Sequence, residues 1–201
     1  MKLYFSPGAC SLAAHISLRE AGVPFELVKT DLRAKKTADG RDFLKINPKG
    51  YVPALELDDG AMLSENVAVL KYIGDRNPAA RLVPASGSME RYRLDEWLAF
   101  INSEVHKSFS PFFSPATPEA YKETLRDKLS QRLNYVQGVL DTRDFLTGSQ
   151  FAVPDAYLFT VLRWAPSANL DLARWPAVKR YSDRIGQRPQ VMAALKAEGL
   201  A

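Results

Sequence analysis

The sequence predicts a mixed α/β domain at the N-terminus and an all-helical domain after it. An apolar run at residues 3–5 ends in Ser-Pro-Gly and leads into a helical pattern and a second strand, in the order of a βαβ unit. Residues 77–88 contain two prolines, a glycine and no periodicity, and only helical spacing follows them. We therefore assign a domain to residues 1–76, a linker to residues 77–88 and a helical domain to residues 89–201.

The first domain begins with a strand that we expect to be buried in a parallel sheet, because its apolar run does not alternate with polar residues. The helix after it starts at Ser11 and ends before Gly22 and Pro24, which are both helix-stopping residues. Residues 25–32 then predict a second strand, parallel to the first.

A short helix, a hairpin and a longer helix complete this domain. After a polar stretch at 33–40, residues 41–46 predict the short helix. Strands are expected at 54–57 and 61–63, because the Asp-Gly pair between them favours a tight antiparallel turn. We expect Ser64 to cap the helix that follows. The resulting order is β-α-β-α-β-β-α.

Apolar residues at helical spacing fill the rest of the chain. Residues 156–165 are apolar nearly all round, which predicts a helix buried at the centre of the second domain. The surrounding helices are indicated by three further sets of residues: Leu94, Trp97, Ile101, Val105 and Phe112; Tyr121, Leu125, Leu129, Leu133, Val136 and Leu140; and Val178, Tyr181, Ile185, Val191 and Leu195.

Composition and charge exclude several classes of function. The chain has 201 residues, of which 46% are hydrophobic and 25% charged, as in ordinary globular proteins. Its formal net charge of +4 is spread along the sequence in runs no longer than doublets, so we expect no nucleic-acid partner. Pro7 interrupts the start too early for a signal peptide, and no apolar run approaches the roughly 18 residues of a membrane span. We expect a cytoplasmic protein that does not bind membranes.

Cys10 is the single cysteine, which excludes an internal disulfide and a cysteine-based zinc cluster. With only His15 and His106 besides, we expect no metal site. Cys10 lies between a strand and the first turn of a helix, where the helix dipole favours a thiolate. The thiol pKa, ordinarily about 8.5, can fall to roughly 3.5–7.5 at such a position. The alternative is a small buried hydrophobic residue, which is what most free cysteines are.

Thioredoxin-like redox proteins have the same order of strand, turn, cysteine and helix, with a Cys-x-x-Cys motif at this point. Ala13 stands in place of the second cysteine, so this protein cannot complete a dithiol cycle by itself. A reaction at Cys10 would need an external thiol, for which glutathione is the obvious small candidate.

Five segments in order carry a more specific pattern: residues 2–12 (KLYFSPGACSL), 47–55 (NPKGYVPAL), 64–66 (SEN), 104–107 (EVHK) and 155–159 (DAYLF). Together they resemble the beta class of bacterial glutathione S-transferases, which carries a cysteine near its N-terminus. The resemblance spans essentially the whole chain. It implies a thioredoxin-like domain followed by an all-helical one, a homodimer, and glutathione as a co-substrate without any further cofactor.

The resemblance also implies a glutathione site in the first domain. Val52 would present its backbone to the cysteinyl part of glutathione, next to a cis peptide bond to Pro53. Glu65 would accept the γ-glutamyl ammonium, and the amides of Glu65 and Asn66 suit the α-carboxylate of the same group. The alternative for Glu65 is a favourable acid in the first turn of a helix.

Two more residues of that domain match family positions. Lys35 matches the residue that meets the glycyl carboxylate, although a lysine in a polar stretch is more often solvated. Ser11 could donate to a thiolate, although serine at a helix start is often only a cap. His15, inside the first helix, is expected to be structural.

In the helical domain, Ser103, Glu104 and His106 match positions close to the glutathione thiol or to the neighbouring subunit's glutathione. The resemblance implies that His106 hydrogen-bonds Cys10 or the bound thiol. The alternative for His106 is a structural role, which is the usual one for an isolated histidine on a helix. A small hydrophobic electrophile would bind against this domain. The side chains that could line its pocket, and that are otherwise core residues, are Phe109, Phe112, Tyr157 and Trp164.

Three residues depart from the family pattern. Asn66 stands where glycine, serine or threonine is expected, which leaves the role of its side chain open although its amide remains. Ala99 stands where related proteins can offer an asparagine across the dimer interface. Ala152 replaces the serine or threonine of a capping box whose acidic residue, Asp155, is retained.

These observations favour a glutathione transferase that conjugates glutathione to hydrophobic electrophiles, in detoxification. Catalysis would rest on holding the glutathione sulfur as a thiolate beside the electrophile, with Cys10 and His106 as the catalytic residues. Tyr4 or Ser11 could replace or supplement Cys10, because other classes of the superfamily use tyrosine or serine. The alternatives are a glutathione-dependent thiol–disulfide exchange enzyme and a non-catalytic binding module.

The departure at residue 152 leads to a stability prediction. A lost cap side chain typically costs about 0.5–2 kcal/mol, which Pro154 in the first turn partly offsets. We expect Ala152→Ser or Ala152→Thr to raise the melting temperature, measured by thermal denaturation. An unchanged or lower melting temperature would contradict the capping assignment.

Overall fold

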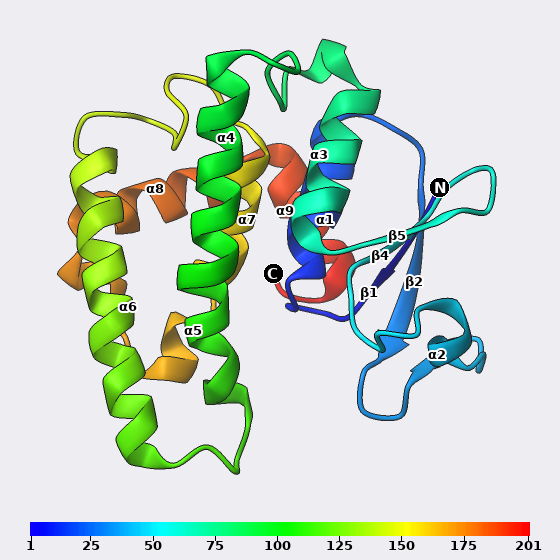
Figure 1. Ribbon diagram of the computed structural model, residues 1–201, viewed down its shortest axis with the longest axis horizontal. Coiled ribbons are helices and arrows are strands. Elements are labelled where there is room, and N and C mark those ends of the chain that lie inside the picture. The colour runs from blue at the N-terminus through cyan, green and yellow to red at the C-terminus, as the bar shows by residue number, and fades with distance from the viewer. The chain divides into compact units, whose positions relative to one another are not determined.

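The computed structural model describes residues 1–201, and its contacts divide the chain into two compact units (Figure 1). Unit 1 comprises Met1–Val83 together with Arg188–Ala201, and unit 2 comprises Pro84–Gln187. The last helix therefore groups with the N-terminal part of the chain, whereas periodicity alone assigns it to the helical domain. The sequence-based domain boundaries stay predictions.

Unit 1 is built on one five-stranded sheet, whose strands are β1 (Lys2–Phe5), β2 (Glu26–Asp31), β3 (Lys36–Thr37), β4 (Ala54–Glu56) and β5 (Met62–Ser64). Their spatial order is β3-β2-β1-β4-β5. Strand β1 runs parallel to β2, with Leu3 opposite Leu27, and antiparallel to β4. The predicted βαβ unit and the predicted β4–β5 hairpin are thereby confirmed.

The two-residue strand β3 is absent from the predicted order of elements. Residues 33–40 read as a polar loop because two residues cannot display a period. In the structure they fold back along β2, and Thr30 pairs with Thr37.

The sheet is covered on one face by α1 (Ser11–Glu20) and α3 (Asn66–Arg76) and on the other by α2 (Phe43–Ile46). The C-terminal helix α9 (Pro189–Glu198) packs against α1. A short 3-10 turn, η1 (Pro78–Ala80), follows α3. The alternation of β1 divides the core in two. Leu3 and Phe5 pack with residues of α1 and α3, whereas Tyr4 packs with Phe43 of α2 on the other face. The predicted burial of β1 on both sides is confirmed.

The start of α3 differs from the prediction. Ser64 is the last residue of β5, and the residue that precedes the helix is Glu65, whose side chain makes no capping hydrogen bond. The backbone of Glu65 has φ 73°, a left-handed conformation that turns the chain from strand to helix within one residue. Ser64 is therefore not the cap, because the reversal happens after it.

The last helix is tied to the first by a buried polar network. Glu198 on α9 accepts a hydrogen bond from the Gly8 amide (3.0 Å) and pairs with His15 Nδ1 (2.9 Å). The other ring nitrogen of His15, Nε2, accepts from Arg19 Nε at 2.8 Å. His15 has the expected structural role. The network also anchors the loop between β1 and α1.

Unit 2 is helical, with α4 (Met89–Phe100), the π-helix η2 (Ile101–His106), α5 (Lys107–Phe109), η3 (Ser110–Phe113), α6 (Glu119–Leu140), α7 (Val153–Leu162), η4 (Ala165–Ala168), η5 (Leu172–Arg174) and α8 (Pro176–Gly186). Every residue of α7 is buried, which confirms the central helix expected from the sequence. No helix of the chain combines the length and apolar character needed to span a membrane.

Asp155, which is fully buried, organises the start of α7. Its Oδ2 accepts from the Ala152 amide (2.8 Å), and its Oδ1 accepts from the Leu146 amide and the Tyr181 hydroxyl. This is the acidic half of a capping box. Ala152 has no side-chain acceptor for the other half, as expected from the sequence.

Gly74 in α3 is required by a close contact rather than by its backbone angles. A Cβ atom at this position would lie 2.5 Å from Val83 Cγ1 and 2.7 Å from Val83 Cγ2. Alanine would add about 0.8–1.0 kcal/mol of helix propensity, but overpacking typically costs about 1–3 kcal/mol. We expect Gly74→Ala to lower the free energy of unfolding by up to about 2 kcal/mol in urea denaturation.

Gly138 in α6 is the matched control, because a Cβ there would meet no atom within 4 Å. Gly138→Ala should stabilise the protein, and Val83→Ala combined with Gly74→Ala should recover the loss caused by the clash. A Gly74→Ala variant as stable as Gly138→Ala would show that the helix accommodates the methyl group.

Candidate functional site

Cys10 connects three segments of unit 1. It is the residue that precedes α1, directly after the loop from β1, and it is partly buried. Its thiol donates to the Val52 carbonyl at 3.2 Å, and its own carbonyl accepts from Asn66 Nδ2 at 2.9 Å. The peptide bond between Val52 and Pro53 is cis, as the family resemblance implied. The start of α1, the segment before β4 and the start of α3 therefore meet at one cysteine.

The electrostatics of this position differ from the expected thiolate site. Burial raises the pKa of the Cys10 thiol to about 12, and the negative charge of Glu65 adds to this effect. Hydrogen bonds from the backbone of Cys10 and Ser11 act in the opposite direction but do not outweigh the burial. The thiol is thus protonated and acts as a hydrogen-bond donor, because desolvation exceeds the effect of the helix N-terminus.

The hydroxyl of Ser11 forms hydrogen bonds with the backbone of the loop that precedes α1. Ser11 Oγ accepts from the Ser6 amide at 3.2 Å and lies 3.4 Å from the Ser6 carbonyl. The side chain is fully buried. These contacts stabilise the turn before Cys10.

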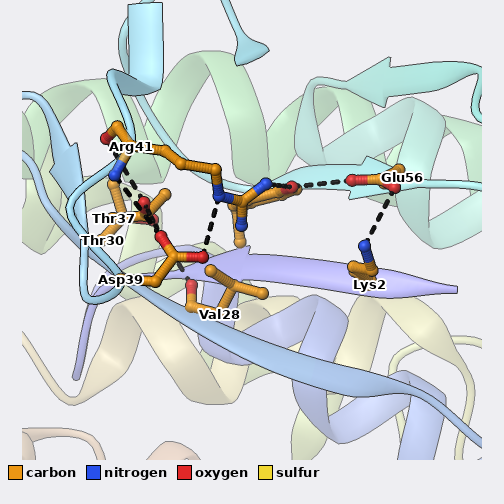
Figure 2. Close-up of polar contacts among 8 residues, drawn as sticks. Lys2, Val28, Thr30, Thr37, Asp39, Arg41 and Glu56 are labelled. Atoms are coloured by element: carbon orange, nitrogen blue, oxygen red, sulfur yellow. Dashed lines mark hydrogen bonds and ion pairs between the residues drawn. The ribbon is translucent and has the colours of Figure 1, made fainter.

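The hydroxyl of Tyr4 also has partners inside the protein, Arg41 and Glu56, which are labelled in Figure 2. It donates to Glu56 Oε2 at 2.7 Å, and Arg41 Nη1 approaches it at 3.4 Å. Burial, together with Glu56, raises the pKa of Tyr4. Glu56 in turn pairs with Lys2 at 3.3 Å, and Arg41 pairs with Asp39 at 2.8 Å. This network binds β1, β4 and the segment after β3 to one another.

Glu65 lies next to Asn66 at the start of α3, and its carboxylate is half exposed. Its Oε1 accepts from Lys49 Nζ at 2.7 Å and from the Tyr51 hydroxyl at 3.0 Å. Sequence reasoning did not single out Lys49 or Tyr51. The one signal for them was their place in the loop that leads to Val52.

Asn66 and Lys35, the two remaining candidates of unit 1, each form a side-chain hydrogen bond to a backbone carbonyl. Asn66 is only 5% exposed, and its Oδ1 has no hydrogen-bond partner, because the amide nitrogen is directed at the Cys10 carbonyl. This is the structural consequence of the departure at residue 66. Lys35 has a left-handed backbone (φ 55°), and its ammonium donates to the Gly50 carbonyl at 2.6 Å.

In unit 2, the π-helix η2 carries all three candidates matched to the glutathione thiol. His106 Nδ1 lies 2.6 Å from the Tyr157 hydroxyl, which donates to Asn102 Oδ1 at 3.0 Å. Because the hydroxyl has only one proton, Nδ1 must donate to it, and Nε2 is left as an acceptor. Burial, with a contribution from Lys107, lowers the pKa of His106 to about 4, so the ring is neutral at pH 7.

Ser103 and Glu104 have partners within unit 2. Ser103 Oγ donates to the carbonyl of Ala99 at 2.9 Å. Glu104 Oε2 accepts from Arg132 at 2.9 Å and pairs with Lys128 at 3.4 Å. The hydrogen bond from Arg132 lowers the pKa of Glu104.

The aromatic candidates are unequal in exposure. Trp164, itself largely buried, packs edge-on against His106 at 4.9 Å between ring centroids, and Phe109 lies behind it, fully buried. Phe112 is half-buried with Arg126 above its ring. Sequence reasoning missed Phe113, which is 54% exposed and contacts Trp164 at 5.4 Å. Its neighbour Phe112 fitted the helical period, and Phe113 did not.

Known proteins match this chain along its whole length. Residues 1–75 match the glutathione S-transferase N-terminal domain, and residues 100–189 match the C-terminal domain. Glutathione S-transferase GstA of Escherichia coli O157:H7 is 48% identical over 200 residues, which is all of both chains. The chain therefore belongs to the glutathione S-transferase family, in its bacterial beta class.

Two solved structures make the similarity specific. A sphingomonad glutathione S-transferase, solved with glutathione, is 51% identical and superposes with a TM-score of 0.96. The beta-class enzyme of Sphingomonas chungbukensis is 47% identical, also with a TM-score of 0.96. Both cover all of this chain and are covered completely by it. The predicted thioredoxin-like domain and helical domain are confirmed.

The protonated thiol leads to a prediction for the free enzyme. Since only the thiolate reacts, a pKa of about 12 should make the alkylation of Cys10 by iodoacetamide rise about tenfold per pH unit between pH 8 and pH 10. A free cysteine, with a pKa of about 8.5, should approach its plateau in the same range. Mass spectrometry of quenched samples measures the rate. A plateau for Cys10 at or below pH 9 would contradict the assignment.

Proposed function

We propose that this glutathione S-transferase binds glutathione in unit 1 and conjugates it, through its sulfur, to small hydrophobic electrophiles. The observation that carries the proposal is the convergence of Cys10, Val52 and Asn66, with Glu65 next to them. Those are the segments expected to bind the cysteinyl and γ-glutamyl parts of glutathione. The glutathione complex of the sphingomonad relative supports it.

Each part of the tripeptide has a chemically suitable partner in unit 1. The backbone of Val52 pairs with the cysteinyl residue as an added strand would. Glu65 accepts the γ-glutamyl ammonium, and the first amides of α3 bind its carboxylate. Lys35 meets the glycyl carboxylate, and the contact with Gly50 holds its ammonium in place.

Cys10 takes part as a hydrogen-bond donor. A protonated thiol can donate to the glutathione sulfur and so stabilise the negative charge that this atom must carry for attack on an electrophile. Thiol–disulfide exchange would require the thiolate of Cys10, which burial disfavours. The pKa shift therefore favours conjugation over exchange as the main activity.

His106 supplies the complementary acceptor. Its neutral ring, oriented through Tyr157 and Asn102, can accept a hydrogen bond from a thiol at Nε2. Because the pKa of His106 is lowered to about 4, this capacity persists throughout the range from pH 6 to pH 8. Ser103 and Glu104 complete the set proposed to act near the glutathione of this or the neighbouring subunit.

The electrophile is proposed to bind at the aromatic group around Trp164, where Phe113 offers an exposed ring. Phe109 and Tyr157 support that group from the core, and Phe112 flanks it. We further propose a cytoplasmic homodimer. Exposed Met89 and Tyr92 on α4 are consistent with a surface that a second copy covers.

The Cys10→Ala variant distinguishes conjugation by the glutathione sulfur from thiol–disulfide exchange through the Cys10 sulfur. Loss of one hydrogen bond to the charged glutathione sulfur should lower kcat/KM for the conjugation of an aryl halide by about tenfold or more. Reduction of a small glutathione mixed disulfide, if it passes through Cys10, should be abolished. Both rates are measured at pH 7 with the same enzyme preparation.

The control is Cys10→Ser, which keeps a donor but no sulfur and should conjugate better than Cys10→Ala. An equal loss of both activities in Cys10→Ala would contradict the assignment of separate roles. Failure of the unmodified protein to bind immobilised glutathione would instead favour a non-catalytic module.

A further inference from the structure

The carboxylate of Glu65 accepts hydrogen bonds from two side chains of the loop before β4. Lys49 Nζ lies 2.7 Å from Glu65 Oε1, and the Tyr51 hydroxyl lies 3.0 Å from the same oxygen. Both side chains are exposed, Lys49 to 46% and Tyr51 to 46%. One acceptor atom of the proposed γ-glutamyl subsite is thus bonded twice before any ligand arrives.

Lys49 presents the same chemical group as the ligand part that Glu65 is proposed to bind. Both are primary ammonium ions that donate to a carboxylate oxygen. A carboxylate oxygen has two lone pairs, and on Oε1 both are used by Lys49 and Tyr51, so a ligand ammonium can bind this oxygen only by displacing one of them. Two ammonium groups on one carboxylate would also repel each other.

We propose that Lys49 is an intramolecular competitor, which pairs with Glu65 and leaves when the γ-glutamyl ammonium binds, while Tyr51 stays and orients the carboxylate. This inference rests on the proposed binding of glutathione and adds two residues to it. Tyr51 is a positioning residue in this scheme, and Lys49 lowers the affinity for the ligand.

The structure indicates which of the two partners moves. The backbone of the loop is anchored by Asn47, whose side chain accepts from the Lys49 amide at 3.2 Å and donates to the Tyr51 carbonyl at 2.7 Å. Beyond that anchor, Lys49 has a long flexible stem, whereas the ring of Tyr51 has only two rotatable bonds. Lys49 can therefore leave without any change in the backbone.

The size of the effect follows from the weakness of exposed ion pairs. The apparent affinity falls in proportion to the fraction of molecules in which Glu65 is not paired with Lys49. Exposed pairs are only modestly populated, so removal of Lys49 should tighten glutathione binding by about twofold to fivefold. Salt screens such pairs, so the gain should shrink at high ionic strength.

The experiment measures dissociation constants by isothermal titration calorimetry for the unmodified protein, Lys49→Met and Lys45→Met. Lys45 is exposed on α2 in the same part of the chain, so its variant loses the same charge without touching Glu65. The probes are glutathione and its des-amino analogue, in which hydrogen replaces the γ-glutamyl amine. Each titration is done at low and at high salt.

We expect Lys49→Met to bind glutathione about twofold to fivefold more tightly at low salt and to bind the des-amino analogue no more tightly than the unmodified protein does. Lys45→Met should show no gain. Weaker binding of glutathione by Lys49→Met would overturn the proposal and make Lys49 a ligand contact. An equal gain in Lys45→Met, or with the des-amino analogue, would overturn it in favour of a general charge effect.

Tyr51→Phe tests the positioning role of Tyr51, and this substitution should weaken glutathione binding rather than tighten it. Loss of its hydrogen bond should raise KM for glutathione by about twofold to fivefold with kcat unchanged, and should not affect the des-amino analogue. Tyr121→Phe, at an exposed tyrosine of α6, is the matched control. An unchanged KM in Tyr51→Phe would remove its positioning role. If the unmodified protein shows no glutathione binding at all, the proposed function fails instead.

Discussion

The proton on the Cys10 thiol is the feature on which the candidate site depends. Burial keeps that proton on the sulfur, and the thiol donates it in a hydrogen bond to the carbonyl of Val52. The carbonyl of Cys10 itself accepts a hydrogen bond from Asn66. Through these two bonds the start of α1, the segment before β4 and the start of α3 are held together. The site therefore has its geometry before a ligand arrives, and its cysteine is a donor rather than an anion.

The same physical cause acts on the candidate base in the other unit. Desolvation disfavours whichever form is charged, so it raises the pKa of a thiol and lowers that of an imidazole. Cys10 and His106 are accordingly both neutral near pH 7. In the proposed reaction the negative charge is therefore on the sulfur of glutathione and not on that of Cys10. Glu65 is different, because it is half exposed and its charge is balanced by Lys49.

Much of the fold could be predicted because its elements have clear periods. The uninterrupted apolar run of β1, the Asp-Gly turn of the hairpin and the all-round apolar pattern of α7 each indicated the right structure. The elements that the sequence did not predict correctly are short or have an irregular backbone. Strand β3 has two residues and no period, and the start of α3 depends on a left-handed residue, Glu65, that no pattern marked.

From the amino-acid sequence one could predict the two kinds of domain, the one cysteine at a helix start and, through the resemblance, the residues of the candidate site. Tertiary structure decided the state of those residues. Cys10 finds its partners 42 and 56 positions away along the chain, and its pKa reflects atoms that surround it only after folding. Local sequence reports the helix N-terminus, whose field favours a thiolate. Desolvation is a property of the packed structure, and here it is the larger effect.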